Sequence, residues 1–203
     1  MEERKYKLTD ETKEVYGITL HRIVALKDFA GVKNGSKGGW IEKESNLSQN
    51  GNAWVYGNAR VYDNARVYDN AEVYDNAEVY GNAEVYGNAE VYGNAEVYDN
   101  AEVYGNAEVY DNAEVYDNAR VYGDARVCNN ADYIVFKNFW SSGRYFTWTR
   151  SNNKWKVGCF YGTGEELIAK AYKDSEKSGR EYERVVRYVE SILADEEKDK
   201  QNK

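Results

Sequence analysis

The stretch that decides the fold is residues 71–94, which read AEVYDNAEVYGNAEVYGNAEVYGN. Its six-residue unit, Ala-x-Val-Tyr-(Gly/Asp)-Asn, places an alanine at every sixth position from Ala53 through Ala125 and again at Ala131. Successive side chains of a strand point to opposite faces, so Ala and Val face inward while the x residue faces outward. The Gly/Asp-Asn pair favours a turn. Each hexad is therefore predicted to form one short strand and one corner.

The repeat continues backward in a weaker form, because Gly39-Trp40-Ile41 and Ser45-Asn46-Leu47 occupy equivalent places. The solenoid is thus expected to span residues 38–131. Its hexads, such as Val55-Tyr56-Gly57-Asn58-Ala59-Arg60, carry an aliphatic residue followed four positions later by a small one. In this the sequence resembles the hexapeptide-repeat proteins of the left-handed parallel β-helix families. The resemblance implies a mainly β fold, a triangular left-handed parallel β-helix with three hexads in each coil, here followed by a small α+β C-terminal cap.

With three hexads in each coil, residues 18 positions apart stack on one another. The tyrosines then form three ladders, in which rings about 4.8 Å apart can stack with an offset. The simpler interpretation is that these ladders only stabilise a thin rod, and the alternative is that they stack against a ligand. The three ladders are Tyr56, Tyr74, Tyr92 and Tyr110; Tyr62, Tyr80, Tyr98 and Tyr116; and Tyr68, Tyr86, Tyr104 and Tyr122.

The outward x position carries a run of glutamates flanked by arginines, and residues 39–131 hold 17 acidic and 5 basic side chains, a net charge of −12. Like charges about 4.8 Å apart repel by ~1 kcal/mol even in water, so these acidic files are expected to cost stability. They either keep the rod soluble or meet a basic partner, in the manner of a nucleic-acid mimic. The candidate partner-binding residues are Glu72, Glu78, Glu84, Glu90, Glu96, Glu102, Glu108 and Glu114.

The flanking segments are expected to cap the two ends of the solenoid, whose terminal strands would otherwise expose unpaired edges. Residues 1–37 are predicted to form a β cap that contains a strand pair. Residues 132–194 are predicted to form three antiparallel strands, with turns at Ser141-Ser142-Gly143 and Ser151-Asn152-Asn153, and then two helices. The first helix opens on the capping box Thr163-Gly164-Glu165-Glu166, and the second follows Gly179. Residues 195–203 form a charged tail that is expected to fray.

The first part of this C-terminal segment interleaves basic and aromatic residues, and no acidic residue lies between Tyr133 and Tyr161. Such a surface can hold phosphates and stack bases. The alternative is that the aromatic side chains form the core beneath the two helices, while the cations are solvated. The candidate partner-binding residues of this basic aromatic head are Lys137, Trp140, Arg144, Trp148, Arg150 and Trp155.

Groups suited to catalysis or metal binding are sparse. The one histidine, His21, lies outside the solenoid, whereas enzymes of the resembled families place a catalytic or metal-binding histidine at a coil junction. Cys128 and Cys159 are too widely spaced for a metal motif and are expected to be reduced. We therefore expect a non-enzyme without cofactor or metal. Two alternatives stay open: an acyltransferase of the hexapeptide-repeat superfamily, and an oligomeric sponge for a small ligand such as a nucleotide.

Two further segments bear on function. The residues Gly38-Gly39-Trp40-Ile41-Glu42 and Gly158-Cys159-Phe160-Tyr161-Gly162-Thr163 resemble those of small hexapeptide-repeat proteins from phages and prophages of gut bacteria. The resemblance implies a phage-encoded accessory protein that inhibits a host factor or defence system. We expect a protein partner, itself a nucleic-acid-binding host protein, rather than direct binding to nucleic acid, and oligomers, if any, through the caps. With no signal peptide or apolar span, the host cytoplasm is the expected location.

Overall fold

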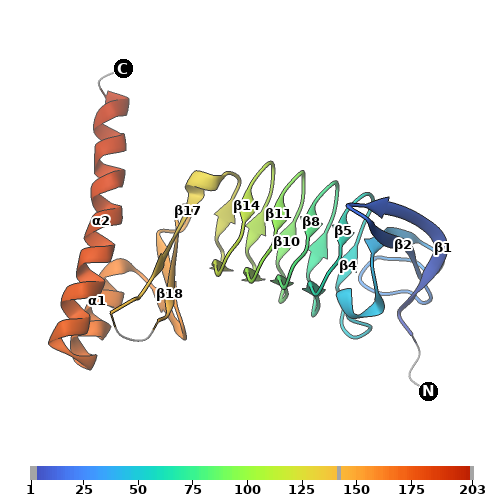
Figure 1. Cartoon of the computed structure of the whole chain (residues 1–203), viewed down its shortest axis with the longest axis horizontal. Coiled ribbons are helices and arrows are strands. Elements are labelled where there is room, and N and C mark those ends of the chain that lie inside the picture. The colour runs from blue at the N-terminus through green and yellow to red at the C-terminus, as the bar shows by residue number, and fades with distance from the viewer. Residues whose placement is uncertain (1–3, 141–142, 202–203) are drawn as a thin grey trace. The chain divides into compact units, whose positions relative to one another are not determined.

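A computed structural model describes residues 4–140 and 143–201, coloured from blue to red along the chain in Figure 1. The chain divides into two compact units. The first comprises the described residues as far as Tyr133 together with Thr149–Asn152, and the second comprises Ile134–Trp148 and the rest of the chain from Asn153. The N-terminal segment and the solenoid, predicted as separate segments, thus lie in one compact unit. None of the described helices is long and apolar enough to cross a membrane.

The first unit is a parallel β-solenoid with three sheets, which confirms three hexads in each coil (Figure 1). We name the sheets by their content. The cap face contains β3 (Lys37–Ile41), β5 (Arg60–Val61), β8 (Glu78–Val79), β11 (Glu96–Val97) and β14 (Glu114–Val115). The Trp54 face contains β4 (Trp54–Val55), β7 (Glu72–Val73), β10 (Glu90–Val91), β13 (Glu108–Val109) and β16 (Arg126–Val127). The Arg66 face contains β6 (Arg66–Val67), β9 (Glu84–Val85), β12 (Glu102–Gly105) and β15 (Arg120–Gly123).

The register of these sheets follows from the repeat. Glu90 pairs in parallel with Glu72 on one side and Glu108 on the other, so neighbours are 18 residues apart. Every alanine of the repeat from Ala53 to Ala125 is completely buried, and so are most of its valines. This narrow core removes about 25 cal/mol of unfavourable hydration for each Å² of apolar surface. The handedness of the solenoid stays a prediction.

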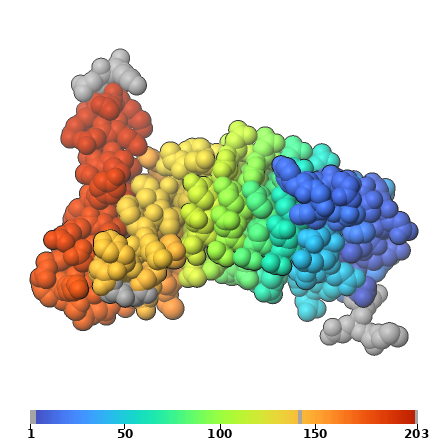
Figure 2. Space-filling model, viewed as in Figure 1, coloured from blue at the N-terminus to red at the C-terminus, as the bar shows by residue number. Residues whose placement is uncertain are grey.

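The corners adopt left-handed backbone angles, as the Gly/Asp-Asn pair predicts. Asp99 has φ +57°, and Gly81, one turn earlier in the same corner file, has φ +68°. A Cβ atom at Gly81 would lie 2.9 Å from the Asp99 nitrogen, which is too close for an unshifted backbone. A glycine therefore relieves crowding where two turns approach each other closely. In the space-filling view the successive turns pack as bands from cyan to yellow (Figure 2).

The N-terminal end of the solenoid is closed by an antiparallel hairpin. Strands β1 (Tyr6–Val15) and β2 (Ile18–Ala25) continue the cap face beyond β3, and the short helix η1 (Glu44–Asn46) follows in the first turn. The backbone amides of the x, Tyr and Asn residues donate to carbonyl oxygens of the following turn, as the Trp54 amide does to the Ala71 oxygen. No such turn precedes the first one, so carbonyl groups of the first turn lack these donors. Side chains supply these donors: Lys5 Nζ binds the Ala53 oxygen at 2.8 Å.

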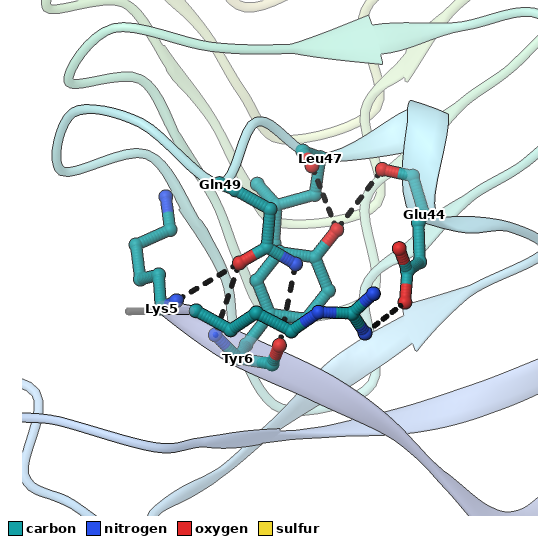
Figure 3. Close-up of polar contacts among 6 residues, drawn as sticks. Lys5, Tyr6, Glu44, Leu47 and Gln49 are labelled. Atoms are coloured by element: carbon teal, nitrogen blue, oxygen red, sulfur yellow. Dashed lines mark hydrogen bonds and ion pairs between the residues drawn. The ribbon is translucent and has the colours of Figure 1, made fainter. Parts of the chain in front are cut away.

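A second set of bonds ties the start of β1 to the first turn, and Figure 3 shows them. The Tyr6 hydroxyl donates to the carbonyl oxygens of Glu44 (3.0 Å) and Leu47 (2.7 Å). The Gln49 side chain accepts from the Lys5 and Tyr6 amides and donates to the Tyr6 oxygen (Figure 3). These contacts confirm that the N-terminal strand pair caps the first coil.

The C-terminal end of the solenoid is closed mainly by acceptors, together with one donor, the Tyr133 hydroxyl, which binds the Glu114 oxygen at 3.0 Å. The Asn130 side chain in helix η2 (Asn130–Asp132) accepts from the Glu114 amide at 2.9 Å. The Asp132 carboxylate accepts from the Cys128 amide at 2.9 Å, and the Ser151 hydroxyl accepts from the Arg126 amide. The two ends are therefore chemically opposite, with donors at the first turn and mainly acceptors at the last.

The second unit is a small sheet covered by two helices. Its order is β17 (Tyr133–Lys137), β18 (Tyr145–Thr149), β19 (Lys154–Val157) and β20 (Phe160–Gly162), one strand more than predicted, because Gly158, at φ +56°, and Cys159 turn the chain back. The turn at residues 151–153 is confirmed, whereas residues 141 and 142 of the other predicted turn lie outside the described part.

The helices of this unit are α1 (Gly164–Asp174) and α2 (Glu176–Gln201). The predicted capping box is confirmed, since the Thr163 hydroxyl accepts from the Glu166 amide. Helix α2 begins three residues before Gly179, because this glycine lets the Tyr172 ring pack closely against the helix. The expectation of a frayed tail from residue 195 is wrong for the described residues: α2 continues to Gln201, and Lys198 pairs with Asp195 across one helical turn.

Candidate functional site: the outer faces of the solenoid

Each predicted glutamate accepts a hydrogen bond from a tyrosine hydroxyl. The donor lies 16 residues earlier, one turn back and two residues along the strand, so that Tyr74 donates to Glu90 at 2.7 Å. The bonds fix each carboxylate against its own face instead of leaving it free in solvent. The eight pairs are Tyr56–Glu72, Tyr62–Glu78, Tyr68–Glu84, Tyr74–Glu90, Tyr80–Glu96, Tyr86–Glu102, Tyr92–Glu108 and Tyr98–Glu114.

The tyrosine ladders form as predicted except at two ends, and at one of these the Tyr122 ring lies 4.5 Å from the Tyr104 ring but is tilted by 33°. From Tyr62–Tyr80 to Tyr98–Tyr116 the ring centroids lie 4.7 to 5.2 Å apart and the rings are nearly parallel. The Tyr56 ring, in contrast, stands at 88° to the Tyr74 ring, with the centroids 6.5 Å apart. The stacked rings fill the outer surface between the glutamates, as expected if the ladders stabilise the rod.

The tyrosine hydroxyls lose acidity in this arrangement. Burial, reinforced by the neighbouring Glu72 carboxylate, raises the pKa of Tyr56 to about 12. Burial and the hydrogen bond to Glu108 likewise raise the pKa of Tyr92 to about 12. Ionisation would place a phenolate beside a carboxylate, and it would also remove the proton that the hydrogen bond needs.

Arginines neutralise half of the glutamates, which reduces the repulsion that was expected to make the acidic files costly. Because stacked residues are 18 apart, the arginines at both ends of the glutamate run lie next to its outer members. The ion pairs are Arg60–Glu78, Arg66–Glu84 (3.4 Å), Arg120–Glu102 (2.8 Å) and Arg126–Glu108 (2.9 Å). On the Arg66 face each described glutamate of the file is thus paired.

Four glutamates have no cationic partner among the described residues: Glu72 and Glu90 on the Trp54 face, and Glu96 and Glu114 on the cap face. These two faces meet at the corner that runs through Asn58, Asn76 and Asn94, where a groove of about 510 Å³ lies beside Tyr56 and Tyr74. We call the four glutamates the acidic edge. It concentrates the uncompensated charge of the files along one side of the prism.

The structure does not present the basic aromatic head as a stacking platform. Trp148 and Trp155 are 1% and 2% exposed and form the core between the sheet and the helices, and Trp140 packs against that core. This corrects the prediction for these aromatic residues, because a sheet this small needs them for its interior. Lys137 lies over the Tyr145 ring, Arg144 is exposed, and Arg150 Nε donates to the Ala131 oxygen. A binding role for these cations stays a prediction.

Residues suited to chemistry are dispersed. His21 Nδ1 lies 3.2 Å from the Thr9 carbonyl oxygen inside the N-terminal hairpin, away from the acidic edge in sequence and register. Cys128 and Cys159 are both free thiols. Within residues 4–140 and 143–201, histidine, cysteine and acidic side chains nowhere gather in threes around a common metal position.

The tyrosine–glutamate bonds were not predicted, although the repeat contains the signal for them. Tyr and the x residue are two positions apart in the hexad and both face outward, so a tyrosine must lie beside the x residue of the next coil. The same 18-residue spacing places Arg60 beside Glu78. The arginine–glutamate contacts within one chain therefore also follow from the repeat period.

Comparison with known proteins supports the repeat architecture. Residues 53–69, 59–75 and 113–129 match the family model described as "YdcK Beta solenoid repeat". The chain is a β-solenoid repeat protein. It is also 38% identical over 61 residues to the protein named "Uncharacterized acetyltransferase YdcK" of Escherichia coli (strain K12). The aligned part covers 26% of this chain and 19% of that protein, so the chain spans about a fifth of the length of this relative.

This similarity overturns one expectation. The chain was expected not to be an enzyme, because its single histidine lies outside the solenoid. A protein named as an acetyltransferase shares part of the repeat, and this contradicts that expectation and makes enzymatic activity a candidate. A histidine at a coil junction is only one arrangement of acyltransferases on this fold, and a fold does not fix where an active site lies.

Proposed function

We propose that the chain binds a basic partner protein through its acidic edge. The observation that carries this proposal is the contrast within one repeat column: four glutamates are neutralised by arginine, and four are oriented by tyrosine yet have no cation within the described residues. Lysine or arginine side chains of a partner would supply the missing charge. Since each carboxylate is already held by a hydroxyl, little side-chain entropy is lost on binding.

We propose further that this partner is a nucleic-acid-binding host protein and that the chain is a phage-encoded inhibitor of a host defence system. Support comes from the resemblance of residues 38–42 and 158–163 to small phage proteins, and from the net charge of −12 over residues 39–131. A file of carboxylates along a rod competes with a phosphate backbone for the same basic surface. Purification of the tagged chain from infected cells would identify the partner, and an oligonucleotide should then displace it.

The sharpest test compares two double variants with equal changes in charge. Glu90→Gln/Glu96→Gln removes two members of the acidic edge, whereas Glu84→Gln/Glu102→Gln removes two glutamates that arginines already neutralise. All four accept a hydrogen bond from a tyrosine. Titration calorimetry with the isolated partner should show at least tenfold weaker binding for the first variant, and about unchanged binding for the second.

The affinity of the parent chain should also fall as salt rises, because exposed charges are screened within about 10 Å at 0.1 M ionic strength. Equal losses of affinity in both variants would mean that net charge alone matters. Unchanged affinity in the first variant at low salt would refute the acidic edge as the binding surface.

A second candidate function is acetyl transfer, which the similarity to a protein named as an acetyltransferase favours. His21 is the side chain best suited to act as a general base near neutral pH. Release of free thiol from acetyl-CoA should be followed with amines and alcohols as acceptors, using the parent chain and His21→Gln. Turnover that disappears in the variant would support this function. If neither amines nor alcohols are acetylated, the binding function is the stronger proposal.

A further inference from the structure

Three cations gather around one indole ring on the outer side of the cap face. Lys13 of β1 places its Nζ atom 4.6 Å from the centre of the Trp40 ring, and Arg22 of β2 places its guanidinium carbon 4.8 Å from it. Arg60 lies next to Trp40 in the sheet, because the two residues are register partners in β5 and β3. We call these four residues the Trp40 cluster. Cations favour the face of an indole, but their mutual repulsion opposes this arrangement.

Carboxylates offset only part of this charge. Glu78 pairs with Arg60, and Glu11, which lies near Arg22, is paired with Lys37 at 2.8 Å. Lys13, Arg22, Arg60 and Lys37 contribute four positive charges, and Glu11 and Glu78 contribute two negative ones. The region therefore keeps an excess charge of about +2. It is therefore a basic region on a solenoid whose remaining outer positions are mostly acidic.

The tip of the N-terminal hairpin covers this region. Tyr62 and Glu78 are 4% and 7% exposed, and all other glutamates of the repeat are more exposed. Tyr16, at the tip, is 83% exposed with φ +52°. Burial and the Glu78 carboxylate raise the pKa of Tyr62 most, and Tyr16 lies near enough to raise it further. The Trp40 cluster thus lies in a half-enclosed position between the hairpin and the cap face.

The cluster also has unused hydrogen-bonding capacity. Arg22 Nη1 donates to the Gly57 oxygen at 2.7 Å, but the Nε atoms of Arg22 and Arg60 are buried without a partner. Lys13 Nζ has a cation–π contact and no hydrogen bond within the described residues. Buried donors without acceptors cost free energy, so the protein alone does not satisfy the hydrogen-bonding groups of this cluster.

We propose that the Trp40 cluster binds a doubly charged oxyanion of the phosphate type. Its charge would balance the excess of about +2, and its oxygens would accept from Lys13 and from the two guanidinium groups, which match phosphate geometry. The hairpin tip limits access of water on one side. This site is separate from the acidic edge, so it goes beyond the proposed function and does not depend on it.

Calorimetric titration of the full chain with inorganic phosphate at pH 7.5 and low salt tests the proposal. Saturable binding of one phosphate is expected, and Lys13→Met and Arg22→Gln should each weaken it at least tenfold. The matched control is Arg66→Gln, because Arg66 also pairs with a glutamate and lies over an aromatic ring, Tyr68, but is not part of the Trp40 cluster. Binding to this control should be unchanged.

A pH series adds a readout that a purely structural cluster would not give. Burial, with a contribution from Arg60, lowers the pKa of Lys13 to about 8, and the other charged groups that face it are Glu78 and Arg22. Phosphate affinity should therefore fall as pH rises from 7.5 to 9.5 in the parent chain, and this fall should be absent in Lys13→Met. The melting temperature of Lys13→Met should stay the same or rise, because an unbalanced charge is removed.

Two further ligands distinguish the source of the oxyanion. If adenosine monophosphate binds more tightly than phosphate while adenosine does not bind, the site takes a phosphate ester; equal affinities indicate free phosphate, and both results support the proposal. No saturable phosphate binding to the parent chain would overturn it. So would equal weakening in Lys13→Met and Arg66→Gln, since that result would reflect screening of net charge.

Discussion

A tyrosine hydroxyl distinguishes the glutamates of this repeat from ordinary surface carboxylates. The hydrogen bond from Tyr74 to Glu90 spans two coils, so it joins turns as well as orienting a charge. Arginine adds a second contact for Glu102 but not for Glu90. The repulsion between stacked glutamates is therefore reduced, because each carboxylate accepts a hydrogen bond from one neutral tyrosine hydroxyl.

We therefore expect Tyr74→Phe to lower the free energy of unfolding by about 0.5–1.5 kcal/mol, the usual net contribution of one hydrogen bond, while the ring stacking is kept. Tyr116→Phe is the matched control, because its ring stacks on Tyr98 but its hydroxyl has no glutamate partner among the described residues. Urea denaturation measures both. Equal effects of the two substitutions would show that the hydroxyl–carboxylate bond adds no stability.

A different residue tests packing in the second unit. A Cβ at Gly179 would lie 2.2 Å from a Tyr172 ring carbon, so Gly179→Ala should destabilise the unit by about 1–3 kcal/mol. Helix propensity alone predicts the opposite sign, a gain of about 1 kcal/mol. Ser191→Ala, at an exposed position of the same helix, is the control. Thermal unfolding followed by tryptophan fluorescence would decide between the two expectations.

At the scale of elements, the tyrosine ladders couple the stability of the solenoid to alkaline pH. A tyrosine in the unfolded chain loses its proton near pH 10, whereas the pKa of Tyr98 is raised to about 12 by burial and by the bond to Glu114. Above pH 10 the unfolded chain therefore binds fewer protons than the folded chain. The stabilising effect is complete below pH 10 and is lost as pH rises toward 12.

We expect the free energy of unfolding to fall steeply between pH 10 and 12. The phenolate absorbance should appear together with the loss of β-sheet circular dichroism. A variant with Phe at Tyr74, Tyr80 and Tyr92 should lose less stability over this interval than the parent chain does. A phenolate titration centred at pH 10 in a chain that stays folded would contradict this expectation.

The elements that the sequence predicted best are those set by a period. Three parallel sheets, the 18-residue register and the buried Ala and Val positions follow from repeated short-range preferences. The extra strand β20 and the early start of α2 were not predicted, because each depends on contacts made only after folding, such as the Tyr172 ring against Gly179. The division of the glutamates into paired and unpaired groups depends on the same 18-residue spacing, and it could have been predicted from the sequence.

At the scale of the whole first unit, the caps differ in chemistry. Lys5, Tyr6 and Arg22 offer donors to the first turn, whereas Asn130, Asp132 and Ser151 offer acceptors to the last. A deletion of residues 1–36 would expose a carbonyl-rich edge, and truncation after residue 127 would expose an amide-rich one. Edges of opposite chemistry can pair, but two copies of the same edge cannot satisfy each other.

We therefore predict that the two truncated chains associate with each other in a one-to-one complex, and that each alone associates far more weakly. Light scattering of the separate and mixed proteins, at equal total concentration, measures this difference. The intact chain mixed with either truncated chain serves as the control and should not associate. Self-association of one truncated chain as strong as that of the mixture would show that the ends are not complementary.

The described contacts of each cap are with the coil next to it, so they do not depend on how many coils lie between the caps. Lys5 and Asp132 each bond to an adjacent coil, and the coils between them are nearly interchangeable. Insertion or loss of 18 residues would therefore add or remove one whole coil while every remaining column stays aligned. A change of 6 residues would instead shift the later columns to the next face. Between Arg66 and Glu78 such a change would also separate both arginines of this end from their glutamates. Gene duplication in steps of three hexads is thus the change in length that preserves the stacking of the rod during evolution.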